Sequence, residues 1–112
     1  MRFCLFILGS FLVLSVLPVF AAEHTALENF KQHCVECHGR DGKSQTRLGR
    51  KSGAKDLSDK MNQAKLTDED AFKGIKFGRK NSKGEEKMEA FGDRLSDKEI
   101  SELVAYIRTL AK

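Results

Sequence analysis

The sequence has few of the residues that usually stiffen a small protein. Its 112 residues include no Trp, one Tyr, three Cys and a single Pro, Pro18, so no Pro occurs in the rest of the chain. No stretch alternates apolar and polar residues for long enough to indicate a β-strand, and no internal repeat is visible. The short length excludes a multidomain enzyme, and the presence of only one long apolar run excludes a membrane protein with several spans.

That apolar run lies at the N-terminus. Residues 1–21 contain a single charged residue, Arg2, followed by an apolar stretch that Pro18 interrupts and that ends at Ala21 and Ala22. This order is typical of a signal peptide. We therefore expect residues 1–21 to be a signal peptide cleaved after Ala21 or Ala22, and the remainder to be exported to the periplasm.

An uncleaved membrane anchor is the alternative, because Phe3–Ala21 could just span a bilayer. Cleavage would leave residues 22–112 as one exported domain with two cysteines, Cys34 and Cys37. Apolar residues make up only about a third of that domain, so we expect its core to be thin. A disulfide that closes so short a loop would add little stability, so a cofactor, metal or partner is expected to complete the fold.

Helical signals dominate residues 22–112. N-cap patterns start at Thr25, Thr67 and Ser96, and each precedes apolar residues spaced three or four apart. These patterns predict helices over about 25–34, 67–77 and 96–111, a weaker helix near 57–64, and a long loop over 39–54. The domain is therefore predicted to be all-α.

The clearest chemical signal is the C-x-x-C-H motif formed by Cys34, Cys37 and His38. This motif is the attachment signal for c-type haem. Two thiols one helical turn apart can each form a thioether with a porphyrin vinyl group, and the His that follows can bind the iron as proximal ligand. A signal peptide agrees with this interpretation, because haem c is attached on the exported side of the membrane.

Three other uses of the Cys pair remain open. A thioredoxin-like redox site expects a βαβ setting, and no strand pattern is present. A structural zinc site needs four ligands, usually in two separated pairs, whereas residues 22–112 contain only one Cys pair. A plain disulfide would leave the thin core unexplained. We therefore expect one covalently bound haem c per chain.

With this motif and two further segments, the chain resembles a small class I cytochrome c, a monohaem bacterial electron carrier. The resemblance rests on Cys34–Gly42 (CVECHGRDG), Lys87–Phe91 (KMEAF) and Leu95–Leu110 (LSDKEISELVAYIRTL). It implies an all-α class I cytochrome c fold, in which three main helices wrap around one covalently bound haem. It also implies that Phe30 and Tyr106 form an aromatic pair where the first and last helices cross.

The same resemblance implies that Met88 is the distal iron ligand. A thioether suits haem iron, His/Met ligation raises the reduction potential, and Met88 lies in an irregular segment. Met61 is the other Met in residues 22–112 and lies near the weaker middle helix. His24 and His33 are expected to be solvated positions rather than ligands.

The chain departs from this family at two points. Members often place Pro directly after the ligating Met, whereas Glu89 follows Met88 here, and we expect Glu89 to loosen this segment or to lower the potential. Members also commonly use a Pro carbonyl to orient the proximal His. Without that Pro, a backbone carbonyl near Leu48-Gly49 is expected to accept the Nδ1 proton of His38.

These residues together predict a one-electron carrier rather than an enzyme. With His38 and Met88 both bound, the iron would have no free position for a substrate. One alternative is a haem c subunit or peroxidase-like protein with a labile distal site, which Glu89 suggests. Another is a membrane-anchored carrier that retains residues 1–21.

Basic residues outnumber acidic ones, with 20 Lys and Arg against 16 Asp and Glu and a net charge of +4. The excess is concentrated over residues 40–60 and 73–87, which border the haem crevice in the family. A basic rim would steer the protein toward an acidic redox partner, although a merely solubilising surface is the alternative. Aromatic residues do not interleave with the basic runs, so no nucleic-acid partner is expected. We expect a monomer with no stable membrane insertion after cleavage.

Overall fold

The structure is a computed structural model in which Ser15 and residues 24–112 are described. The predicted cleavage sites, and all of the predicted signal peptide except Ser15, therefore lie outside the described residues. Residues 24–112 form α1 (Ala26–His33), α2 (Val35–His38), α3 (Arg47–Ser52), α4 (Lys60–Lys65), α5 (Asp68–Phe77), β1 (Arg79–Lys80), β2 (Glu86–Met88) and α6 (Asp97–Arg108). None of the helices in this part of the chain is long and apolar enough to cross a membrane.

The three strongest helix starts are where the sequence predicts them. The hydroxyls of Thr25 and Ser96 accept hydrogen bonds from the backbone N–H groups three residues on, each at 3.2 Å. In both cases the Glu at that third position reaches back to the N-cap backbone, which completes a capping box. Thr67 caps α5 in the simpler way, by accepting from the N–H of Asp70 at 3.1 Å. The predicted all-α architecture with three main helices is confirmed.

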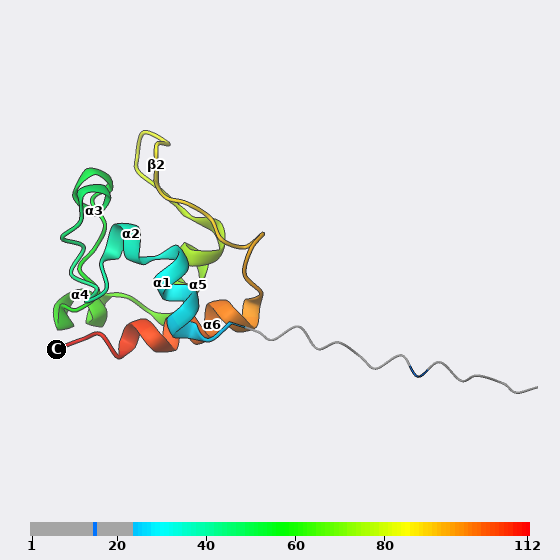
Figure 1. Ribbon diagram of the computed structural model, residues 1–112. Coiled ribbons are helices and arrows are strands. Elements are labelled where there is room, and N and C mark those ends of the chain that lie inside the picture. The colour runs from blue at the N-terminus through cyan, green and yellow to red at the C-terminus, as the bar shows by residue number, and fades with distance from the viewer. Residues whose placement is uncertain (1–14, 16–23) are drawn as a thin grey trace, which may run out of the picture.

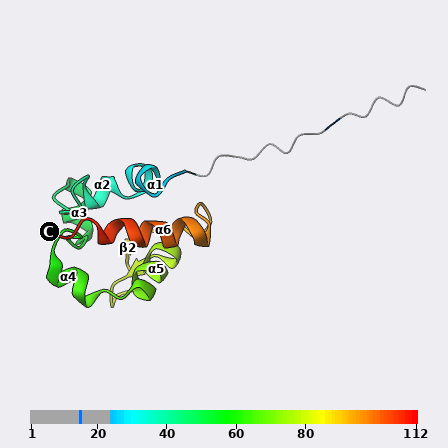
Figure 2. The same cartoon turned by 90° about the horizontal axis from the view of Figure 1, so that it is seen from below.

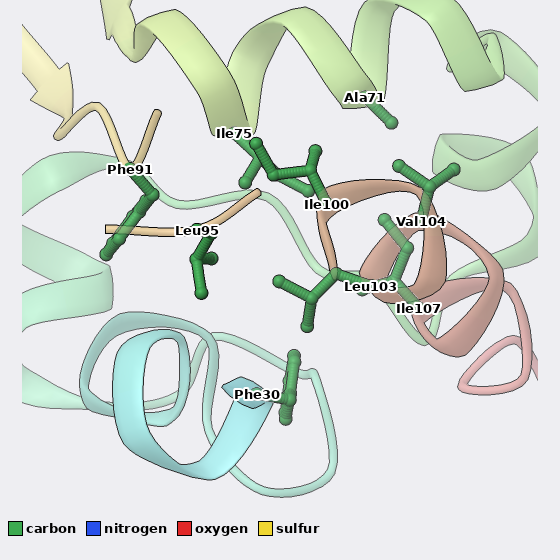
Figure 3. Packing of buried hydrophobic residues seen from close by; sticks show 9 residues of the cluster. All are labelled: Phe30, Ala71, Ile75, Phe91, Leu95, Ile100, Leu103, Val104 and Ile107. Atoms are coloured by element: carbon green, nitrogen blue, oxygen red, sulfur yellow. The ribbon is translucent and has the colours of Figure 1, made fainter. Parts of the chain in front are cut away.

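Helix α6 lies between α1 and α5 and contacts both (Figure 2). Helices α2 and α3 contact each other, and the β1–β2 hairpin projects away from α6 (Figure 1). The core lies between α1, α5 and α6 (Figure 3). It consists of Phe30, Ala71, Ile75, Phe91, Leu95, Ile100, Leu103, Val104 and Ile107. Its small size agrees with the thin core expected from composition.

Two local features differ from the sequence prediction. A hairpin occurs where no strand was expected, with Arg79 opposite Met88. Strands of two and three residues are too short to produce an alternating pattern. Helix α3 lies inside the predicted loop over 39–54, and Thr46 caps it by accepting from the N–H of Gly49 at 2.9 Å. Leu48 is the single apolar residue of this six-residue helix, so no apolar spacing indicates it.

One side chain of α6 anchors the connection between α4 and α5. The guanidinium of Arg108 donates to the backbone and side-chain oxygens of Gln63 at 2.8 and 2.6 Å. It also donates to the carbonyl of Leu66 and to Asp68 Oδ1. Gln63 is buried, and its Nε2 donates to the carbonyl of Ile107 at 2.8 Å. A network of this kind fixes α4 although few apolar residues hold it.

Replacing Arg108 with Ala should lower the free energy of unfolding by about 2–3 kcal/mol, because several charge-assisted hydrogen bonds are lost together. Urea unfolding of the haem-loaded protein measures this change. Arg40→Ala is the control, since Arg40 is exposed, and it should stay within about 0.5 kcal/mol of the parent. Equal effects of the two substitutions would contradict the anchoring role of Arg108.

Candidate haem site

An apolar cavity of about 540 Å³ lies among the main helices. Six core residues line it, namely Phe30, Ala71, Ile75, Phe91, Leu103 and Ile107. A volume of this size falls within the range of about 300–1,000 Å³ that is usual for cofactor pockets. The middle of this small domain therefore has room for a large apolar molecule.

The C-x-x-C-H residues reach this cavity from α2. Cys34 is the residue between α1 and α2, and Cys37 and His38 follow one turn later, with the N–H of His38 donating to the Cys34 carbonyl at 2.9 Å. All three residues line the cavity. Burial and the neighbouring Cys37 raise the pKa of the Cys34 thiol to about 12, and burial also raises the pKa of Cys37. Both thiols are therefore uncharged at neutral pH.

These properties weigh against the other uses of the Cys pair. A redox-active C-x-x-C site requires a thiol with a lowered pKa, whereas both pKa values are raised here. The two sulfurs are not joined in a disulfide. Within the described residues, no group of three or more Cys, His, Asp or Glu side chains is placed to hold a metal ion, as a structural zinc site would need.

A backbone carbonyl orients the ring of His38. The Nδ1–H of His38 donates to the carbonyl oxygen of Lys55 at 3.1 Å, and the hydroxyl of Ser44 donates to the same oxygen. Because a carbonyl only accepts, the proton is on Nδ1 and the lone pair on Nε2 is free. Burial lowers the pKa of His38, which also favours the neutral ring. A neutral imidazole fixed in this way is suited to bind iron.

The expected acceptor near Leu48-Gly49 is wrong, since Lys55 provides the carbonyl. Gly49 has a different role, because it lets α3 approach α2 closely. A Cβ at Gly49 would lie 2.2 Å from the carbonyl oxygen of Cys37, too close for any other residue. Sequence reasoning also missed Ser44, because a single Ser in a polar loop gives no distinguishing signal.

The two candidate methionines lie in different surroundings. Met88 ends β2, is half-buried and lines the cavity. Met61 lies on α4 with 66% of its surface exposed and does not line the cavity. The contrast favours Met88 as an iron ligand.

Glu89 does not leave the Met88 segment unsupported. Its carboxylate lies 3.0 Å from the guanidinium of Arg94. Arg94 in turn lies over the ring of Phe91, with 4.4 Å between the guanidinium carbon and the ring centre. The negative charge beside Met88 is therefore balanced by a nearby positive charge.

The remaining candidates divide between expected and unexpected positions. Phe30 and Tyr106 form the expected aromatic pair, with 5.1 Å between ring centres. His24 is exposed, as expected. His33 was expected to be solvated, but it is half-buried, lines the cavity and packs edge-to-face against Phe91, with 5.5 Å between the ring centres. Burial lowers the pKa of His33, so it lies in the wall of the site as a neutral ring.

A haem suits this cavity. The walls are mainly apolar, as a porphyrin requires, and uncharged thiols and a neutral imidazole lie where the attachment motif needs them. Cys34 and Cys37 would hold the porphyrin through thioethers, and His38 would bind the iron.

Comparisons with known proteins agree with this arrangement. Residues 21–107 match the family described as cytochrome c oxidase, cbb3-type, subunit III. A solved structure described as the KustC0563 c-type cytochrome is 32% identical, with a TM-score of 0.69, and the match covers 80% of this chain and all of that one. A mutant of that cytochrome, with Tyr replaced by Phe, is 33% identical, with a TM-score of 0.66, and the match covers 78% of this chain and 99% of that one. A search of curated protein sequences found no match. The cavity, the motif, the family match and the similar solved structures all indicate one family. The chain belongs to the c-type cytochromes, the haem proteins that carry electrons.

Proposed function

We propose that this chain is an exported monohaem cytochrome c that carries single electrons between larger redox proteins. The observation that supports this most is the apolar cavity, because it is lined by both the neutral ring of His38 and the thioether of Met88. When bound, the haem supplies the one-electron couple of ferric and ferrous iron. The matched family is described as a cbb3-type oxidase subunit, whereas the similar solved chain, which the match covers in full, is described as a c-type cytochrome.

In this proposal, His38 and Met88 would both bind the haem iron. The carbonyl of Lys55 holds the His38 ring in one tautomer, and that hydrogen bond makes Nε2 a stronger ligand. The apolar walls exclude water and limit the rearrangement that follows a change of charge. With His38 and Met88 both holding the iron, no site for a substrate would remain, so the proposed function is transfer of electrons rather than catalysis.

Replacing Met88 with Ala should remove the thioether ligand and lower the reduction potential, by an amount on the order of 100 mV or more. Redox titration of the haem-loaded protein measures this shift. Met61→Ala is the matched control, since Met61 is exposed on α4, and its potential should equal that of the parent.

Carbon monoxide binding to the ferrous protein separates the carrier from a peroxidase-like protein with a labile distal site. We expect slow binding in the parent and fast binding in Met88→Ala. Fast binding in the parent, or an unchanged potential in Met88→Ala, would rule out stable ligation by Met88.

We also propose that residues 1–21 are removed on export and that one haem is bound through Cys34 and Cys37. The intact mass of the denatured protein, recovered from the periplasm, tests both parts. The expected mass is that of residues 22–112 or 23–112 plus one haem. A mass that includes residues 1–21 would instead indicate a membrane-anchored carrier, and loss of the haem on denaturation would contradict thioether attachment.

The partner is proposed to be a redox protein with an acidic docking surface. Four basic residues line the cavity mouth, namely Lys55, Arg79, Lys80 and Lys87. Three carboxylates also line it. Glu89 is paired with Arg94, and among the basic residues Lys87 lies 3.6 Å from Glu85, so the positive charge at the cavity comes chiefly from the other three basic residues. The resulting positive field would raise the rate of encounter with a negatively charged partner.

Two small oxidants of opposite charge test this field. Oxidation by hexacyanoferrate(III) should slow as ionic strength rises, whereas oxidation by hexaammineruthenium(III) should speed up. Lys80→Glu should slow the reaction with hexacyanoferrate several-fold at low salt, because Lys80 lines the cavity. Lys60→Glu, the same charge change on α4, should have a smaller effect. The same salt dependence for both oxidants would contradict a basic rim.

A further inference from the structure

The backbone around Met88 is attached to the C-terminal end of α5. The N–H of Phe91 donates to the carbonyl of Ile75 at 2.9 Å, and the N–H of Gly92 donates to the carbonyl of Lys76 at 3.0 Å. Carbonyls in the last turn of a helix have no partner within that helix, so they are free to accept these bonds. The segment over 88–92 is therefore tied to a rigid helix rather than to a flexible loop.

Gly78 is the point where the two backbones come closest. A Cβ at Gly78 would lie 2.6 Å from the carbonyl oxygen of Met88, 3.0 Å from the nitrogen of Ala90 and 3.1 Å from the carbonyl carbon of Glu89. The backbone of Gly78 also has φ +75° and ψ −177°, a conformation that is essentially restricted to glycine. Two separate constraints therefore require glycine at this position.

We propose that Gly78 is a positioning residue for Met88. The close backbone contact at Gly78 sets how far the Met88 segment stands from α5, and so sets where the thioether lies in the cavity. Immediately after this contact, Arg79 lies opposite Met88 in the hairpin, which continues the alignment. Where members of the family often have Pro after the ligating Met, this chain has Glu89, and contact between two backbones replaces the stiffness of the Pro ring.

This inference rests on the proposed ligation by Met88, and Gly78→Ala in the haem-loaded full chain tests it. An added methyl group should push the Met88 carbonyl away and weaken the sulfur–iron bond. The near-infrared charge-transfer band of thioether-bound ferric iron should be lost or reduced at least twofold. Carbon monoxide should bind the ferrous protein at least tenfold faster than it binds the parent.

Gly84→Ala is the matched control. Gly84 lies in the turn of the same hairpin with φ +79°, so an Ala there also has to adopt a left-handed φ, but no atom lies within 4 Å of its Cβ position. Gly84→Ala should keep the near-infrared band and stay within twofold of the parent in carbon monoxide binding. Both variants are compared below their unfolding temperatures, so that a loss of stability alone does not change the readout.

The possible outcomes separate this inference from the proposed function. If Met88→Ala removes the band and Gly78→Ala does not, the positioning role is overturned and ligation by Met88 stands. If Met88→Ala leaves the band unchanged, the ligand assignment itself fails. An equal loss of the band in Gly84→Ala would assign the effect to strain in the hairpin and overturn the contact at Gly78.

Gly92→Ala decides the question if Gly78→Ala does not fold. A Cβ at Gly92 would lie 2.8 Å from the carbonyl oxygen of Lys76, so this variant displaces the same segment from α5 without a left-handed backbone. A weakened band and faster carbon monoxide binding are again expected. An unchanged band would show that docking of this segment on α5 does not position Met88.

Discussion

The fold depends on an apolar cavity whose walls are the core itself. Six of the nine core residues line the cavity, including Ile75 of α5 and Leu103 of α6. The helices contact one another directly, and one side of the core that they form is a wall of the cavity. A haem would bring into that space the apolar surface that a small domain needs for stability. The residues that stabilise the fold and those that hold the cofactor are thus largely the same, and neither can change independently.

The wall of the cavity beside His38 is built by a closed loop between α2 and α4. The N–H of Leu57 donates to the carbonyl of Gly42 at 2.7 Å, which brings the two ends of this loop together. That closure returns the chain to the cavity, and the carbonyl of Lys55 then meets His38 Nδ1. In this loop Gly49 fits against the carbonyl of Cys37, so α3 braces the attachment motif. The orientation of one imidazole therefore depends on a whole loop.

Features that depend on residue identity could be predicted from the sequence. Thr25 and Ser96 are helix caps because a hydroxyl at that position accepts backbone N–H groups, and the pattern is local. The C-x-x-C-H motif is equally local. The acceptor of His38 could not be found in this way, because every residue has a carbonyl and only the path of the chain selects that of Lys55. The hairpin that ends at Met88 could not be predicted for a related reason, since pairing between two strands of two and three residues depends on tertiary contacts.

The wall of the cavity beside Met88 has a different construction from the wall beside His38. There, no Pro stiffens the segment after Met88, and the residue that follows is a carboxylate. Two features compensate for this. The charge of Glu89 is balanced by Arg94, which lies over Phe91 and so links the ion pair to the core. The hydrogen bonds from Phe91 and Gly92 to α5 hold the backbone itself. Because backbone contacts depend little on side-chain identity, such a segment can hold the thioether of Met88 at one place in the cavity without a Pro, as the proposed binding of iron by Met88 requires.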